Sequence, residues 1–214
     1  MRARHSTPYF FATFDPRHAQ ARRDLADPYE MHRTLARTYA LDADTPPPRF
    51  LWRLERRADD QPSSVVLVQS EYPAHWSRLE ALPSYVAAIH ADKPVDLEQL
   101  IQPTKRYRFR VLANPTVTRE GKRLGLMREE EQLDWLTRQG ERNGFVVLGC
   151  VRAASELLRV RQGRTGNRIA VQTALFEGVL EASDSESLRS GLLNGLGHAK
   201  SLGLGLLSLA KVAG

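Results

Sequence analysis

The pattern of hydrophobic and polar positions divides the chain into two successive sets of strands and helices. In the first half, the segment that follows Asp27 and Pro28 begins like a helix, with a capping residue and a proline at the first helical position. Met31, Leu35 and Tyr39 then recur every four residues, which indicates a helix with one buried face. Short β-prone segments predict four strands, and a helical or irregular segment precedes the last of them; the strands are 9–14, 50–54, 64–69 and 86–89.

The pattern restarts after a proline-containing connector at residues 92–104. Residues 106–113 alternate between arginine and apolar side chains, so they predict a strand with a basic face and with Tyr107 and Phe109 toward the core. The remaining elements are helices at 129–138 and 183–193 and strands at 145–151, 157–160, 168–172, 174–181 and 206–212. The sequence therefore predicts an α+β protein. It has two tandem ferredoxin-like (RRM-like) β-α-β-β-α-β domains, residues 1–91 and 105–214, the second with an extra basic β-hairpin.

Composition restricts the classes of partner and compartment. The formal net charge is +6 and the pI is about 9.8, which favours an anionic partner, nucleic acid first and an anionic membrane second. The alternative is an ordinary basic protein from a genome rich in arginine codons. Cys150 is the single cysteine, so a disulfide within the chain and a cysteine-based zinc site are excluded. No run approaches 18 apolar residues, and we expect a soluble, cytoplasmic protein.

The segment 195–205 is rich in glycine and holds one lysine and one serine. Glycine allows a backbone N–H to approach an anion closely. The segment matches neither the Walker loop nor the dinucleotide-binding fingerprint. Its candidates for RNA binding are Gly195, Gly197, Gly203, Lys200 and Ser201. The alternative is a tightly packed connection between a helix and a strand.

A possible acid–base centre lies at the start of the helix that follows Pro28. Imidazole titrates near neutral pH, so His32 can both accept and donate a proton. Arg33 can stabilise charge on a phosphoryl oxygen, and Tyr29 lies one turn before His32 on the same helix face. The alternative is a histidine with no catalytic role.

A basic hairpin in the second half can follow RNA phosphates. Its arginines are Arg159, Arg161, Arg164 and Arg168, and the first two point to one face of a strand. The alternative is a solvated charged surface. No histidine pair has metal-ligand spacing and no nuclease carboxylate cluster is present, which argues against a two-metal mechanism.

Four segments resemble the CasE family of CRISPR-associated endoribonucleases. They are GLGHAKSLGLGLLSLA at 195–210, RRDLADPYEMHRTL at 22–35, FRVLANPT at 109–116 and VQTALFEGVLE at 171–181. The resemblance implies binding of a CRISPR repeat stem-loop and cleavage at its base without a metal or other cofactor. The substrate's 2′-hydroxyl would attack the adjacent phosphate, leaving a 2′,3′-cyclic phosphate and a 5′-hydroxyl.

The resemblance also assigns roles to residues. His32 matches the family's general acid/base, Tyr29 is expected to orient the scissile phosphate, and Arg33 is expected to stabilise charge. The hairpin around Arg159 and Arg161 corresponds to the element that grips the duplex, and Lys200 falls in a loop near the RNA. The protein would stay bound to mature crRNA and join the antiviral Cascade complex, and it would be a monomer when free of Cascade.

Three other functions remain open from the residues alone. One is an RNA-binding protein of the same fold in which His32 is incidental. Another is a small-molecule-binding protein whose glycine-rich loop holds a nucleotide phosphate. The third is a scaffold subunit of Cascade that does not bind free RNA.

Overall fold

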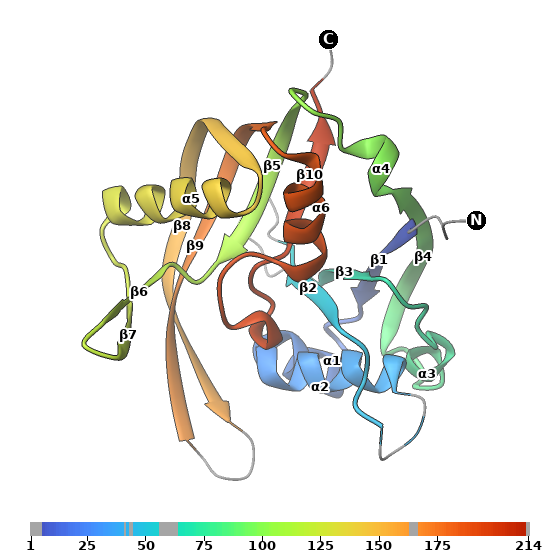
Figure 1. Cartoon of the computed structure of the whole chain (residues 1–214). Helices are drawn as coiled ribbons and strands as arrows, with labels where there is room; N and C mark the ends of the chain where they lie inside the picture. The colour runs from blue at the N-terminus through green and yellow to red at the C-terminus, as the bar shows by residue number, and fades with distance from the viewer. Residues whose placement is uncertain (1–5, 41, 43–44, 56–63, 163–166, 213–214) are drawn as a thin grey trace. The chain divides into compact units, whose positions relative to one another are not determined.

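Each half of the chain builds a four-stranded antiparallel sheet with helices packed on it (Figure 1). The computed structural model describes residues 6–40, 42, 45–55, 64–162 and 167–212. These fall into two units. The first contains the described residues up to Asp96 together with those of Val160–Arg168 and Ser201–Gly203, and the second contains the rest. No helix among the described residues is long and apolar enough to cross a membrane.

The first unit has the order β-α-α-β-β-α-β. Its elements are β1 Ser6–Phe14, α1 Ala19–Ala26, α2 Pro28–Tyr39, β2 Phe50–Leu54, β3 Val65–Ser70, α3 Ser77–Glu80 and β4 Val86–Asp96. The strands lie in the order β2-β3-β1-β4, with Ala12 of β1 opposite Val66 of β3 and Ile89 of β4. The predicted fourth strand is longer than expected. It continues to Asp96, so the expected connector begins inside a strand and then forms α4 (Leu97–Leu100).

The second unit repeats this topology. Its main elements are β5 Arg106–Ala113, α5 Glu129–Arg142, β8 Phe145–Gln162, β9 Asn167–Ala182, α6 Ser185–Asn194 and β10 Leu207–Lys211. The strand order β10-β5-β9-β8 is the order of the first sheet read from the opposite edge. Both units thus have the ferredoxin-like strand order, and the predicted fold class is confirmed.

The extra hairpin differs from the prediction. The arginine-rich hairpin consists of the far ends of β8 and β9, each a single long strand where two short strands were expected. The additional hairpin is instead β6 (Thr116–Arg119) with β7 (Lys122–Gly125), which the sequence pattern did not indicate. The basic extension therefore belongs to the sheet itself, and the added hairpin lies between β5 and α5.

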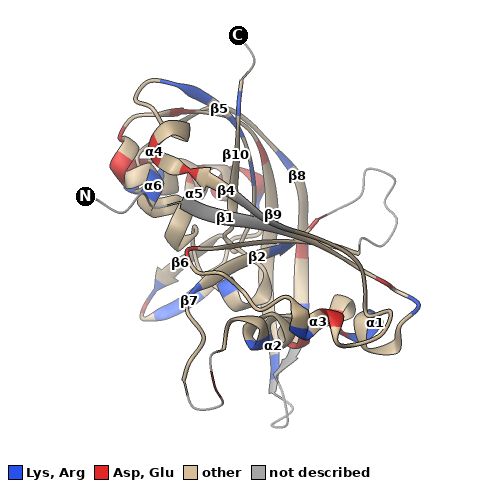
Figure 2. Cartoon of the chain, turned by 90° about the vertical axis from the view of Figure 1, so that its right-hand side faces the viewer, with Lys and Arg blue, Asp and Glu red and all other residues tan. Residues whose placement is uncertain are grey.

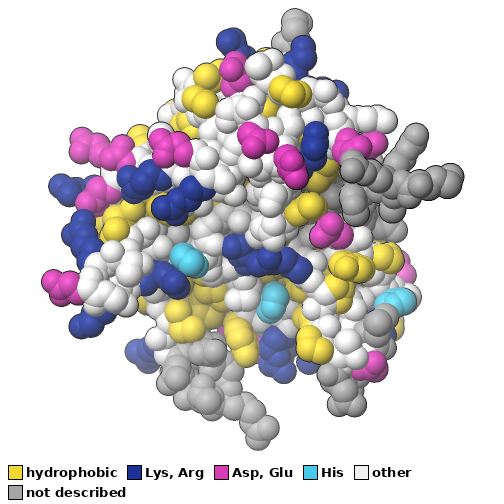
Figure 3. All heavy atoms as spheres, in the orientation of Figure 1, with side chains coloured by type: hydrophobic (Ala, Val, Ile, Leu, Met, Phe, Trp, Pro, Cys, Tyr) yellow, Lys and Arg dark blue, Asp and Glu magenta, His cyan; other side chains and the backbone are white. Residues whose placement is uncertain are grey.

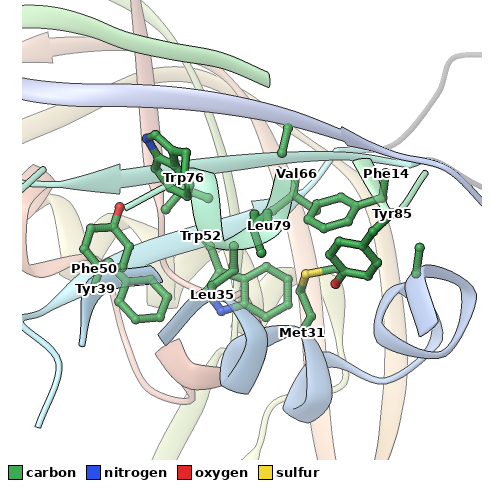
Figure 4. Packing of buried hydrophobic residues seen from close by; sticks show 13 residues of the cluster. Phe14, Met31, Leu35, Tyr39, Phe50, Trp52, Val66, Trp76, Leu79 and Tyr85 are labelled. Carbon is green, nitrogen blue, oxygen red and sulfur yellow. The ribbon is translucent and has the colours of Figure 1, made fainter. Parts of the chain in front are cut away.

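Aromatic and aliphatic side chains from the helices and the sheet form the core of the first unit. Met31 and Leu35 of α2 are buried against Phe14, Trp52 and Val66 (Figure 4). The apolar stripe predicted for this helix is therefore its buried face, and the opposite face is left for other roles.

Candidate active site

Helix α2 begins where the sequence predicted, because its capping residues are in place. The side chain of Asp27 accepts a hydrogen bond from the backbone N–H of Tyr29 at 2.9 Å, and Pro28 is the first helical residue. The helix therefore starts at a fixed residue, which sets the direction in which Tyr29 and His32 project.

A buried carboxylate ties α2 to its neighbours. Asp24 of α1 is fully buried and accepts hydrogen bonds from the Thr34 hydroxyl at 2.8 Å and the Tyr85 hydroxyl at 2.7 Å. The Arg23 guanidinium also donates to it, at 3.1 Å. Burial and the hydrogen bond that Tyr85 donates to Asp24 raise the pKa of Tyr85, so its hydroxyl stays protonated and remains a donor. Thr34 lies on α2 two residues beyond His32, so the contact fixes the helix close to the candidate catalytic residue.

His32 is half-buried against an aromatic stack. Its ring lies 5.0 Å from that of Phe50 at an interplanar angle of 21°, and Phe50 stacks in turn on Tyr39 at 4.9 Å. Nδ1 is buried without a hydrogen-bond partner among the described residues, which leaves Nε2 as the nitrogen that can meet a substrate. Burial lowers the pKa of His32 below the 6.5 of an exposed histidine. At neutral pH the imidazole is therefore neutral, the form that accepts a proton.

We expect an NMR titration of the free protein to find the midpoint of the His32 imidazole below 6.5. Desolvation disfavours the charged ring, so the proton is released at lower pH than from an exposed histidine. Comparison with His32→Gln would assign the signal to His32. A midpoint at or above 6.5 would contradict the buried environment described here.

Tyr29 and Arg33 flank His32 on α2. Tyr29 is half-buried and lies one turn before His32. Arg33 is half-exposed and pairs with Glu30 at 3.0 Å. An exposed pair of this kind contributes at most about 1 kcal/mol, so the guanidinium can exchange Glu30 for a phosphate oxygen at small cost.

Residues Ser201–Gly203, here called the tip of the glycine-rich loop, belong to the same compact unit as His32. Gly203 has φ +76°, and a Cβ there would lie 3.0 Å from the Trp52 ring. Trp52 and Phe50 occupy alternate positions of β2 and so point to one face of the sheet. Gly203 packs on the first and His32 on the second, so one strand supports both. Ser201, exposed at the start of this tip, is brought into the unit that carries the histidine.

The rest of the loop lies in the second unit. Gly197 has φ +73° and approaches Trp135 of α5 so closely that a Cβ would lie 2.9 Å from the ring. Gly195 is the C-cap of α6, and Lys200 Nζ donates to the carbonyl of Gly197. Close packing and positive φ angles explain why glycine occupies these positions. This agrees with the alternative given for the loop, a tightly packed connection between a helix and a strand. A role in RNA binding stays a prediction for them and for Lys200.

The arginine-rich surfaces divide into paired and unpaired groups. On β5, Arg106 and Arg110 pair with glutamates directly opposite on β9, at 3.1 Å to Glu181 and 2.7 Å to Glu177. That face is therefore largely neutralised. On the long hairpin, Arg159 and Arg168 are exposed and form no ion pair with another described residue.

Two of the predicted hairpin residues cannot be placed in the same way. Arg164 and the side chain of Arg161 lie outside what the structure describes. The assignment of the hairpin to RNA binding therefore stays a prediction for these two residues.

Sequence reasoning missed Phe50, Trp52 and Asp24. The alternating aromatic pattern of 50–54 could have indicated the first two, but their partners lie far away in the sequence. Within the described ranges, no three or more His, Cys, Asp or Glu side chains come together as a possible metal site.

Comparison with known proteins agrees with the fold and with the family resemblance. The family model described as "CRISPR associated protein" matches residues 11–211. CRISPR-associated endoribonuclease Cse3 of Thermus thermophilus is 38% identical over 208 residues, covering 92% of this chain and 96% of Cse3. The CRISPR system Cascade subunit CasE of Escherichia coli K12 is 30% identical over 203 residues, with 89% and 95% covered. The structure of T. thermophilus Cse3 bound to an RNA representing a pre-cleavage complex has a TM-score of 0.85 at 37% identity, covering 96% and 99% of the two chains.

Proposed function

Because the chain belongs to the CRISPR-associated protein family that includes the endoribonuclease Cse3 and the Cascade subunit CasE, we propose that it processes CRISPR precursor RNA. It binds the repeat hairpin, cleaves at the base of the stem, keeps the mature crRNA and joins the other Cascade subunits. We place this reaction in the cytoplasm.

One observation carries the catalytic part of this proposal. His32 presents Nε2 from a fixed helix, while the Phe50 ring and the surrounding core hold its imidazole neutral. A neutral, oriented imidazole is the group that proton transfer at neutral pH requires. No described carboxylate or carbonyl fixes its Nδ1 proton, so Nε2 can act as acceptor or donor.

The proposed reaction uses the substrate's own hydroxyl. His32 Nε2 takes the proton of the 2′-hydroxyl as its oxygen bonds to the adjacent phosphorus. The bond from phosphorus to the 5′-oxygen of the next nucleotide breaks, and that oxygen takes up a proton. The products are a 2′,3′-cyclic phosphate and a 5′-hydroxyl, so no water is consumed.

The neighbouring residues hold the scissile phosphate. Arg33 would neutralise charge that develops on the phosphoryl oxygens, and Tyr29 would orient the group through its hydroxyl. In-line geometry supplies much of the rate, which is why a small catalytic set is enough. Neither role uses a metal ion, so the proposed mechanism is independent of metals.

The proposal predicts that the protein cuts a labelled cognate repeat hairpin at one position, at the same rate with EDTA as with Mg²⁺. Single-turnover gel assays would measure the rate, with a repeat of shuffled sequence as the control substrate. The assignment as a repeat-specific endonuclease would be refuted if the protein cut both RNAs at many positions. It would also be refuted if the protein did not cut the cognate hairpin. Loss of cutting in EDTA would refute metal independence alone.

A further inference from the structure

The second unit carries a group of three basic side chains. Arg123 of β7 and His198 of the glycine-rich loop are exposed, and Lys200 is half-buried. Partial burial lowers the pKa of His198, and the positive charges of Arg123 and Lys200 lower it further. Arg123 and Lys200 are therefore each close enough to act on the His198 ring. Figure 2 shows the basic positions along β7 as blue ribbon.

The β6–β7 hairpin directs Arg123 to one face. Glu120 and Gly121 form its tight turn with φ of 49° and 73°. Thr118 pairs with Arg123 and Thr116 with Gly125, so these residues share a face, whereas Arg119 and Lys122 share the other. Gly125 faces β9 so closely that a Cβ would lie 2.8 Å from Gln172 Cβ. The Arg123 side chain thus leaves the hairpin on the face turned toward the sheet.

Buried amides fix both ends of this hairpin. Before β6, the Asn114 amide donates to the Gln172 carbonyl at 2.6 Å; after β7, the Gln132 amide donates to the Leu126 carbonyl at 2.7 Å. The Gln132 and Gln172 amides also donate to the Ser155 hydroxyl, at 3.1 and 2.9 Å. A network with its hydrogen bonds satisfied holds a rigid geometry, so the backbone at both ends of the hairpin that carries Arg123 is fixed.

The glycine-rich loop packs beside Asn114, the residue that precedes the β6–β7 hairpin. A Cβ on Gly197 would lie 3.6 Å from the carbonyl oxygen of Asn114, and the Trp135 ring lies beneath it. Lys200 Nζ donates to the carbonyl of Gly197. His198, the next residue, is therefore fixed beside the start of the hairpin.

We propose that Arg123, His198 and Lys200 form a binding site for a phosphodiester group of RNA. Neither Arg123 nor His198 pairs with a carboxylate among the described residues, so the N–H groups of both can turn to an anion. An arginine beside an imidazole provides directed donors that match phosphate oxygens. On the face drawn in Figure 3, Lys and Arg side chains gather on the side where the β6–β7 hairpin lies. This assignment rests on the proposed function, since it names a contact of the same RNA.

The test is the binding of a repeat hairpin with a single 2′-deoxyribose at the scissile position, measured at several salt concentrations. Arg123→Ala should weaken binding about tenfold and reduce the slope of log K against log salt by about 1. Arg123→Lys should keep the slope, because the charge remains. The matched control is Arg138→Ala, which removes an exposed arginine of α5 and should change neither quantity. Cleavage of the unmodified hairpin by Arg138→Ala should stay within about twofold of wild type.

The outcomes separate this site from the proposed function. If wild type binds and cuts the hairpin but Arg123→Ala has the same affinity and slope, the phosphate site is refuted and the surface serves another partner. A loss of affinity with an unchanged slope also refutes it, because the contact is then not ionic. If wild type neither binds nor cuts the hairpin, the proposed function itself fails, and the phosphate site fails with it.

Discussion

Replacing His32 by alanine should slow single-turnover cleavage of a cognate repeat hairpin by about 10²- to 10⁴-fold. The affinity for the uncut hairpin should change by less than about threefold, because the neutral ring contributes proton transfer and no charge. Loss of one acid–base group has an effect of this size when no neighbouring side chain can replace it. No second histidine is placed on α2, where Tyr29 and Arg33 flank His32.

Retained binding would show that His32→Ala is folded, since the ring also packs on Phe50. The matched control is His90→Ala: this exposed histidine lies on β4, at the opposite edge of the sheet from β2, and its loss should leave the rate unchanged. Equal cleavage by His32→Ala and wild type would remove His32 from the reaction and leave only the RNA-binding part of the proposal.

Asp24→Ala should lower the free energy of unfolding by about 3 kcal/mol. The substitution leaves the buried hydroxyls of Thr34 and Tyr85 without their acceptor, and it removes a fully buried side chain that joins α1 to α2. For a chain of this length the melting temperature should fall by about 6–12 °C. Urea unfolding or calorimetry would measure the loss.

Two variants sharpen this test. Asp134→Ala removes an exposed carboxylate of α5 and should stay within about 0.5 kcal/mol of wild type. Tyr85→Phe removes one donor and leaves the carboxylate in place, so it should cost less than Asp24→Ala. A loss below about 1 kcal/mol for Asp24→Ala would show that the network does not hold α2 in place.

Elements with a buried stripe were predictable from the sequence, and elements without one were not. Helix α2 and strand β5 have clear apolar periodicity, and both form as expected. Helix α1 was not predicted, because its buried residues are Ala21 and Asp24, a small residue and a charged one, which form no apolar stripe. Strands β6 and β7 have no buried residue, so no alternation between core and solvent indicated them. The local sign of this hairpin is the Glu120–Gly121 turn between its two strands.

Only the residues of the candidate site that lie on helix α2 were predictable from the sequence. Spacing along α2 placed Tyr29, His32 and Arg33 together, since residues three or four apart are neighbours on a helix. The environment of His32 depends on Phe50, and that of the glycine-rich loop on Trp52 and Trp135, which other elements supply. Such long-range packing decides the pKa of the imidazole and the need for glycine, and no local pattern encodes it.

The chemical form of the product ends tests the proposed mechanism most directly. Wild-type protein would cut the cognate repeat hairpin in EDTA, and mass spectrometry would identify the ends of both fragments. Attack by the 2′-hydroxyl predicts a 2′,3′-cyclic phosphate on the upstream fragment and a 5′-hydroxyl on the downstream one. A 3′-hydroxyl with a 5′-phosphate would show that water or a metal-bound hydroxide attacked, and it would contradict the role proposed for His32.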